Sequence, residues 1–388
     1  MVEDDGGGRL FGDDLERLGE FRTDGRFGVE QTPHDFVLGQ IGARTVAPAV
    51  AFAASRVEPE FAAYAFVHRF GQRLRGLHRK AMEKVRFAIV AGGLRCVDGM
   101  RHLATHRHDL QRDHVARAAV TRFGIAPLTS MYWYSETKKT TAIDWRPEVH
   151  DSDGLSMWSG NGERLWRPLN NPPRIMISAF TDNNPRGFGL SQRDRVFDHY
   201  LDGVYYDRRP TLWVEPMPAA DGSGWGKGWI QLCEIPTDDE IHDNVVAMWV
   251  PDQPPPAGAE IALNYRLHWL ADEPYPPKLA RCVATRLGRG GQPGLPRPAG
   301  VRKFVVEFLG GPLATLPYGV KPDMVVTASR GSLQGYRLIE AVPDDVPGHW
   351  RAEFDLTVDG ADPVELRCFL QANGETLTET WMFQYHPF

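Results

Sequence analysis

The clearest structural pattern lies in residues 211–270, which read TLWVEPMPAADGSGWGKGWIQLCEIPTDDEIHDNVVAMWVPDQPPPAGAEIALNYRLHWL. Four short runs in this stretch are rich in β-branched and aromatic residues, and they are TLWVEPM, GWIQLCEI, VVAMWV and IALNYRLHWL. Turn-forming Gly, Pro, Asn and Asp separate them. Short runs of this kind, without helical periodicity between them, predict an all-β sandwich.

The same pattern continues on both sides of this stretch, from residue 121 to the end. The runs before it are TSMYWY (129–134), RIMISAF (174–180) and GFGLSQ (187–192). The runs after it are KFVVEFLG, MVVTASRG, YRLIEAV, HWRAEFDLTVDG, PVELRCFLQANG and LTETWMFQYHP. A region rich in Pro and Gly stands between the two groups. We therefore predict a β-sandwich region over 121–272, a linker over 273–300 and a small immunoglobulin-like sandwich over 301–388.

Residues 1–120 have a different composition. All eleven tryptophans follow residue 120, whereas seven of the thirteen histidines precede it. The segment has Ala- and Arg-rich stretches and lacks the strand pattern seen later. We treat 1–120 as a separate, unrecognised segment, either out of frame or disordered. Our hypothesis is that residues up to about 118 are translated out of frame or from a misplaced start.

The histidines of this segment raise the question of a metal site. His102, His106, His108 and His114 lie close together in the sequence, but no Asp, Glu or Cys accompanies them at ligand spacing. A solvated His- and Arg-rich stretch is the simpler interpretation. The first residues, MVEDDGGGRLFGDD, show neither the basic nor the apolar region of a secretory signal.

Overall composition excludes several classes of protein. The net charge of -6 is unlike the basic field of a nucleic-acid-binding protein. There is no apolar stretch of 18 residues that would insert into a membrane. The four cysteines are scattered without metal-type spacing and are expected to be small buried apolar residues. We therefore expect no metal and no cofactor.

Two acidic runs carry the candidate chemistry, HDSDG (150–154) and PTDDEIHDN (236–244). Taken alone, the first reads as an Asx-type turn and the second as a solvated acidic loop. The residues between them change that interpretation, because aromatic faces stack on sugar rings and polar side chains bind hydroxyl groups. The aromatic residues between the two acidic runs are Trp158, Trp166, Tyr205, Tyr206, Trp213 and Trp225. The polar residues between them include Arg167, Asn170, Asn171, Gln192, Arg193, Asp194 and Arg209. Since glycosidases work with a pair of carboxyl groups, the pattern predicts a carbohydrate site.

These residues stand in motifs that resemble the periplasmic glucan biosynthesis family (MdoG/OpgG and MdoD/OpgD), over residues 122–388. The matching motifs are GIAPLTSMYW, RPEVHDSDGL, GNGE, WRPLNNP, NPRGFGLSQRDR, FDHY, RPTLWVEP, WGKG, EIPTDDEIHDN and ETWMFQY. The details MYW, FDHYLDGVYY and LWVEP are closer to the D-type member. The resemblance implies a large galactose-mutarotase-like β-sandwich, incomplete here in its N-terminal half, followed by a small immunoglobulin-like domain.

The resemblance also implies roles for individual residues. It makes Asp151 the general base and Asp243 the general acid of an inverting glycosidase or transglycosylase that acts on β-1,2-linked glucan. The sugar contacts that it implies are Trp158, Arg167, Gln192, Arg193, Tyr206, Trp225 and Glu240. The expected partner is β-glucan, the expected location is the periplasm, and a homodimer stays open. The alternative is a glucan-binding or assembly factor without catalysis, or an inactive product that lacks part of the fold.

Overall fold

The computed structural model describes residues 36–38, 106–115, 121–141 and 144–387. Within these residues the regular structure consists of strands β1 to β21 and four short 3₁₀ turns, η1 (Glu136–Thr141), η2 (Phe197–His199), η3 (Tyr206–Arg208) and η4 (Gly311–Thr315). The all-β prediction is confirmed. No helix in this part of the chain has the length and apolar character needed to cross a membrane.

A five-stranded sheet forms one layer of the first core. In spatial order it contains β1 (Phe36–Leu38), β3 (Arg122–Ser130), β12 (Val245–Pro251), β11 (Lys227–Glu234) and β8 (Met176–Asn183). Strand β11 pairs antiparallel with β12 from Gly228↔Pro251 to Glu234↔Val245. Side chains alternate between the two faces of a strand, so every second residue of β3, β11 and β12 points toward the opposite sheet and into the first core.

A ten-stranded sheet forms the opposite layer and extends beyond it. Its spatial order is β16 (Asp323–Ala328), β19 (Val364–Ala372), β21 (Thr380–Tyr385), β7 (Arg164–Pro168), β6 (Gly154–Trp158), β9 (Gly187–Ser191), β10 (Thr211–Met217), β13 (Glu260–Leu270) and β2 (His106–Val115). The tenth strand, β20 (Glu375–Thr376), pairs with β19. Residues such as Leu128, Phe188 and Trp249 fill the first core between the two layers.

A four-stranded sheet covers the other end of the long sheet and encloses a second core. It contains β14 (Arg281–Arg289), β15 (Val301–Leu309), β18 (Trp350–Thr357) and β17 (Arg337–Ala341). Aromatic stacking dominates this core, since Phe304 lies 5.2 Å from Phe354 and Trp381 lies 5.6 Å from Phe383 between ring centroids. The remaining pair, β4 (Tyr132–Tyr134) and β5 (Val149–His150), forms a small separate ribbon.

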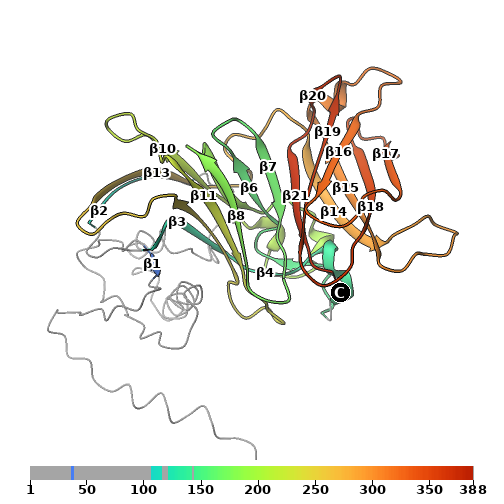
Figure 1. Cartoon of the computed structure of the whole chain (residues 1–388), viewed down its shortest axis with the longest axis horizontal. Coiled ribbons are helices and arrows are strands. Elements are labelled where there is room, and N and C mark those ends of the chain that lie inside the picture. Colours follow the sequence, from blue (N-terminus) through green and yellow to red (C-terminus); the bar gives the residue numbers. More distant parts are fainter. Residues whose placement is uncertain (1–35, 39–105, 116–120, 142–143, 388) are drawn as a thin grey trace, which may run out of the picture. The chain divides into compact units, whose positions relative to one another are not determined.

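The two cores share one sheet. Strand β21 pairs in parallel with β7, with Trp381 opposite Trp166, and Trp166 itself packs in the second core. Figure 1 shows β21 lying alongside β7 where the green strands meet the red ones. The boundary between the predicted domains is therefore crossed by a continuous sheet. The domain limits at 120, 272 and 300, and the immunoglobulin-like character of the C-terminal part, stay predictions.

The strands observed differ from the sequence expectations in several places, and the short strands β1, β5 and β20 also lie outside the predicted runs. Every run predicted as a strand overlaps one, but β6 and β7 were interpreted only as site motifs, because their Ser, Gly and Arg residues hide the alternation. Strand β14 (Arg281–Arg289) lies inside the expected linker 273–300, where it pairs with β15. Strand β2, inside the segment 1–120, pairs with ten residues of β13. His106, His108 and His114 belong to β2, while His102 lies outside the described residues.

The cysteines behave as expected in the described part of the chain. Cys233, Cys282 and Cys368 are buried, and Cys96 lies outside the described residues. Burial raises the pKa of Cys368 to about 12, which keeps its thiol protonated and inert.

Candidate functional site

The two acidic runs meet on either side of one short segment, residues 130–132. The backbone N–H of Asp151 donates to the carbonyl of Met131 at 2.8 Å, and the backbone N–H of Asn244 donates to the carbonyl of Ser130 at 3.1 Å. Consecutive carbonyls of an extended chain point in opposite directions, so the two runs flank the segment. Because hydrogen-bonded strands lie about 4.8 Å apart, the backbones of Asp151 and Asn244 are separated by about 10 Å.

Asn244 fixes the position of its neighbour Asp243. Its side-chain oxygen accepts the N–H of Tyr132 at 2.8 Å, and its amide nitrogen donates to the carbonyls of Tyr132 at 2.9 Å and Ile235 at 2.8 Å. Asn244 is fully buried, whereas Asp243 is partly exposed. This arrangement holds the backbone of the second acidic run, and Asp243 keeps part of its surface exposed.

A chain of side-chain contacts connects the two runs. Arg209 Nε lies 3.0 Å from Asp151 Oδ1, and the Arg209 guanidinium stands 5.2 Å from the ring centroid of Tyr206. The Tyr206 hydroxyl donates to Glu240 Oε1, and Arg146 Nη1 donates to Glu240 Oε2 at 2.7 Å. We call Asp151, Arg209, Tyr206, Glu240 and Arg146 the acid cluster. It places three residues expected in the site, Asp151, Tyr206 and Glu240, in one connected group.

Local backbone geometry positions the aromatic member of the acid cluster. Tyr205, directly before η3, adopts a left-handed conformation with φ of 61°. This conformation is uncommon for a bulky residue and persists only where the surroundings enforce it. It turns the chain so that Tyr206 is buried while Tyr205 stays exposed.

The electrostatics of the acid cluster keep its tyrosine protonated. Burial, the charge of Asp151 and the hydrogen bond to Glu240 raise the pKa of Tyr206. A phenol that stays protonated remains a hydrogen-bond donor at neutral pH. Burial also lowers the pKa of the nearby His242, which favours its neutral form.

The model of the family described as "Periplasmic glucan biosynthesis protein, MdoG" matches residues 90–385. The chain belongs to this family. The match begins ahead of residue 122, where the motif resemblance begins, and it includes strand β2.

Curated relatives of this family are also similar to the chain. "Glucans biosynthesis protein D 2" of Ralstonia nicotianae is 69% identical over 272 residues, which are 70% of this chain and 50% of that protein. "Glucans biosynthesis protein D" is 49% identical over 276 residues in Xanthomonas campestris and over 274 residues in Stenotrophomonas maltophilia, again 70% of this chain and 50% of each relative. The chain spans half the length of the curated relatives that it matches.

Two residues expected to contact sugar in this MdoG-family chain are instead deeply buried. Gln192 is 0% exposed, and its amide bonds to His150, Tyr200 and the carbonyl of Tyr206. Arg167 is 1% exposed and forms an ion pair with Glu234 at 3.0 Å. Their burial favours a role in positioning the acid cluster and the core over direct contact with a ligand.

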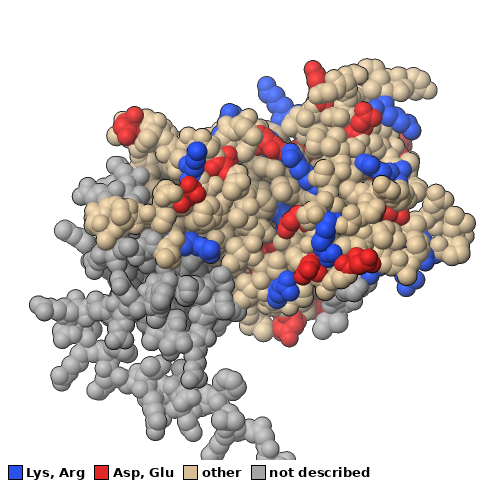
Figure 2. Space-filling view, in the orientation of Figure 1, with Lys and Arg blue, Asp and Glu red and all other residues tan. Residues whose placement is uncertain are grey.

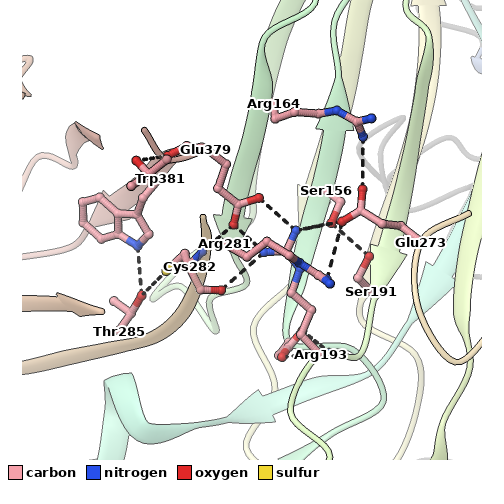
Figure 3. A network of polar contacts seen from close by, with 12 residues as sticks. Ser156, Arg164, Ser191, Arg193, Glu273, Arg281, Cys282, Thr285, Glu379 and Trp381 are labelled. Atoms are coloured by element: carbon pink, nitrogen blue, oxygen red, sulfur yellow. Dashed lines mark hydrogen bonds and ion pairs between the residues drawn. The ribbon is translucent and has the colours of Figure 1, made fainter. Parts of the chain in front are cut away.

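Arg193 joins the two cores. Its guanidinium bonds to Glu379 at 2.5 Å and to Glu273 at 3.2 Å, and it stacks 3.7 Å from the ring centroid of Trp166. Figure 3 shows these contacts together with the bond from Arg193 to Ser156 and the ion pair of Arg164 with Glu273. The Arg193 backbone N–H donates to both oxygens of Asp153, at 3.1 Å each. Arg193 therefore ties the loop that carries Asp151 to the C-terminal part of the chain.

The expected tryptophans lie outside the acid cluster. Trp158 ends β6, where Arg164 lies 3.8 Å from its ring centroid. Trp225 packs against Trp249 and Tyr265 beside the first core, and its indole N–H donates to the carbonyl of Asn264 at 3.3 Å. Both tryptophans keep a partly exposed surface.

Sequence reasoning missed Arg146 as a member of the acid cluster. It stands in the motif WRPEV, which was interpreted as an extended segment without a role for the guanidinium. Its partner Asp144 is two residues away, but Asp202 and Glu240 come from two distant segments, which no local spacing reveals. Arg209 was expected only as one of several residues able to bind hydroxyl groups.

Among the described residues, one group has the composition of a metal site. Glu148, Asp194 and His199 place ligand atoms within 4.8 Å of one another. However, Glu148 already bonds to His150 at 3.0 Å, and Asp194 already bonds to His199 at 2.5 Å. We assign no metal to this group. On the face shown in Figure 2, acidic and basic side chains of the described residues are interspersed, without the basic field typical of nucleic-acid binding.

Proposed function

We propose that this chain acts on β-1,2-linked glucan by inverting hydrolysis or transglycosylation, with Asp243 as general acid and Asp151 as general base. The observation that carries the proposal is the attachment of both acidic runs to residues 130–132. Inverting glycosidases place their two carboxyl groups about 6.5–9.5 Å apart to leave room for a water molecule. A backbone separation of about 10 Å is compatible with that requirement.

The acid cluster supports the same reaction. In an inverting mechanism Asp243 protonates the leaving glycosidic oxygen, while Asp151 removes a proton from the attacking water. Arg209 orients the carboxylate of Asp151, and Tyr206 and Glu240 offer a donor and an acceptor for sugar hydroxyls. Proton transfer among carboxyl groups, water and sugar requires no cofactor.

The remaining expected residues take different parts in this proposal. Trp158 and Trp225 keep partly exposed aromatic faces for stacking on glucose rings. Three buried or partly buried residues act through their neighbours and not by touching the sugar. Gln192 holds Tyr206, Arg167 holds the first core, and Arg193 holds the loop that carries Asp151. The family's description as periplasmic glucan biosynthesis supports this proposal, and we propose the periplasm as the place where the reaction occurs.

The direct test is to incubate the protein with linear β-1,2-glucan and follow chain length and the configuration of the new ends. Asp243→Asn keeps the shape of the side chain and removes its acidic proton, so turnover should fall by about 10²–10⁴-fold. Asp238→Asn, at an exposed position of the same acidic run, is the matched control and should keep full turnover. Unchanged turnover in Asp243→Asn would remove this residue from the mechanism.

A second function is a glucan-binding or assembly factor without catalysis. It is favoured by the length of the chain, which spans half of each curated relative. In that case glucan binding would persist in both Asp151→Asn and Asp243→Asn, and no new chain ends would form with the unmodified protein. Sedimentation of the same samples would show whether the chain forms a homodimer.

A further inference from the structure

His150, next to Asp151 on β5, lies between two hydrogen-bond acceptors. The residue is fully buried. Its Nε2 atom lies 3.0 Å from Glu148 Oε2, and its Nδ1 atom lies 3.1 Å from Gln192 Oε1. Whether each ring nitrogen carries a proton therefore depends on whether the atom opposite it can donate a hydrogen bond or only accept one.

The orientation of the Gln192 amide settles the first nitrogen. Gln192 Nε2 lies 3.0 Å from the carbonyl oxygen of Tyr206 and 3.4 Å from that of His150. A carbonyl oxygen can only accept, so the NH₂ group must face these two atoms. The amide oxygen then faces His150, and its partner Nδ1 must carry a proton.

The second nitrogen faces a carboxylate. An ionised carboxylate only accepts hydrogen bonds, so Nε2 must donate to Glu148. We propose that His150 is held as a doubly protonated imidazolium between Glu148 and Gln192, and that this charged ring is a positioning residue for Tyr206. The charge state stands by itself, whereas the positioning role rests on the proposed function.

The groups packed around His150 favour the positive charge. Tyr132 of β4 stacks on the ring at 5.6 Å, and Tyr200, which follows η2, meets it edge-on at 5.3 Å. Burial lowers the pKa of His150, but the hydrogen bond and charge of Glu148 and the charges of Asp153 and Asp194 raise it above its ordinary value. The charges that raise the pKa of His150 thus come from carboxylates, of which Glu148 contacts the ring directly.

The positioning role follows the bonds of Gln192. A protonated Nδ1 holds the Gln192 oxygen, which leaves the Gln192 NH₂ group directed at the Tyr206 carbonyl and the Tyr200 hydroxyl. Tyr206 in turn contacts Glu240 and Arg209 of the acid cluster. Loss of the Nδ1 proton would set two acceptors against each other and release the amide that orients Tyr206.

The charge state is tested by NMR of the ¹⁵N-labelled full chain, through correlations between ring nitrogens and ring protons. His150 is assigned from the signal lost in His150→Asn or, if that variant does not fold, from the signal that moves in Glu148→Gln. We expect both nitrogens of His150 to be protonated at pH 7.5. A neutral ring with a single protonated nitrogen at that pH overturns the proposal.

Glu148→Gln is the decisive variant because glutamine is nearly the same shape. Its NH₂ group can donate to a neutral Nε2, so the fold keeps its hydrogen bond while the charge loses its counter-ion. The pKa of His150 should fall by about 1–3 units. The matched control is Glu215→Gln, at a separate carboxylate–histidine pair where Glu215 lies 2.8 Å from His268, and it should leave the His150 signals unmoved.

The positioning role is tested by turnover of linear β-1,2-glucan as a function of pH. His150→Phe removes the Nδ1 donor that holds the Gln192 oxygen and should lower kcat by about tenfold or more, because small misplacements of reacting groups are costly, and should leave KM nearly unchanged. In Glu148→Gln a neutral ring keeps its Nδ1 proton, so kcat should be retained and the alkaline limb of the kcat profile caused by deprotonation of His150 should disappear. A limb that stays in place overturns the positioning role. An imidazolium in a protein without any turnover overturns the proposed function and leaves the charge state standing.

Discussion

Arg146 and Arg193 each bind carboxylates from distant segments, yet they do so in different surroundings. The partners of Arg193, Glu273 and Glu379, have side chains that are 3% and 1% exposed. Of the partners of Arg146, Glu240 is 23% exposed and Asp202 is 9% exposed. The same pairing of charges therefore occurs once in the interior, at the junction of the two cores, and once near the surface, in the acid cluster.

The difference separates a buried network that holds the two cores together from one whose carboxylates are partly exposed. A buried ion pair must be fully hydrogen-bonded, because an unmatched charge in the interior is very costly. Glu379 meets this demand, since its Oε1 also accepts the backbone N–H of Cys282 at 2.7 Å. The carboxylates of the acid cluster keep surface that water or a sugar can reach.

The strongest way to break the comparison is to remove one carboxylate from each network. Glu379→Ala leaves Arg193 and the Cys282 N–H short of an acceptor and should destabilise the fold by about 3–5 kcal/mol. Glu240→Ala should cost less, about 1–2 kcal/mol, because its ion pair is partly solvated and the main loss is the hydrogen bond from Tyr206. Urea unfolding of both variants measures the difference. Equal costs would mean that burial does not separate the two networks.

A second prediction concerns pH and the junction between the cores. Glu136 accepts the backbone N–H of Thr285 at 2.6 Å, and burial together with the charge of Glu148 raises its pKa from 4.5 to about 7. The folded state thus binds a proton that the unfolded state has lost, so stability should fall as the pH rises from about 4.5 to about 7. At about 1.4 kcal/mol per pKa unit, the contribution is about 3 kcal/mol.

Glu136→Gln tests this pH dependence. Glutamine can still accept from Thr285 but does not ionise, so the slope of unfolding free energy between pH 4.5 and 7 should flatten. Glu375→Gln, at an exposed position in β20, serves as the control and should keep the slope of the unmodified chain. A slope that survives Glu136→Gln would assign the effect to another group.

The smallest expected effect comes from the removal of a single hydroxyl group, once inside the acid cluster and once outside it. Tyr206→Phe removes the donor to Glu240, and Tyr275→Phe removes a similar bond to Glu215, which measures 3.1 Å. Each should cost about 0.5–1.5 kcal/mol in thermal unfolding. Only Tyr206→Phe should weaken binding of β-1,2-glucan, measured by calorimetry. Equal losses of glucan affinity in both variants would exclude a specific role for Tyr206.

Much of the fold could be predicted from the sequence, because alternation of apolar and polar residues identifies a strand wherever one of its faces is apolar. The run in β15 shows this alternation, whereas β12 is apolar throughout because both of its faces are buried. The criterion fails for β6, where Ser156 faces a serine of β9 across a 3.0 Å hydrogen bond instead of an apolar neighbour. The same criterion fails for β14, because the polar residues of β14 are of the types found in linkers. Only its pairing with β15 gives this segment a strand conformation.

The site was predictable only in part. Residue type and order brought forward Asp151, Tyr206 and Glu240, which do lie in one cluster. Sequence alone could not separate a guanidinium that reaches a surface cluster from one that enters the interior. Arg209 and Arg167 have similar neighbours in the chain, yet the first pairs with Asp151 and the second lies buried against Glu234. That distinction depends on long-range packing.

The parallel pairing of β21 with β7 has a consequence for synthesis of the chain. Strand β7 ends at Pro168, but its partner begins only at Thr380. At the usual rate of about 5–20 residues per second, β7 must wait roughly ten to forty seconds on the ribosome for the strand that covers it. During that time it is an exposed sheet edge, the kind that recruits other chains. The synthesis of β21, near the end of translation, thus completes the long sheet and the second core, and chaperones that bind nascent chains would have a defined interval in which to act.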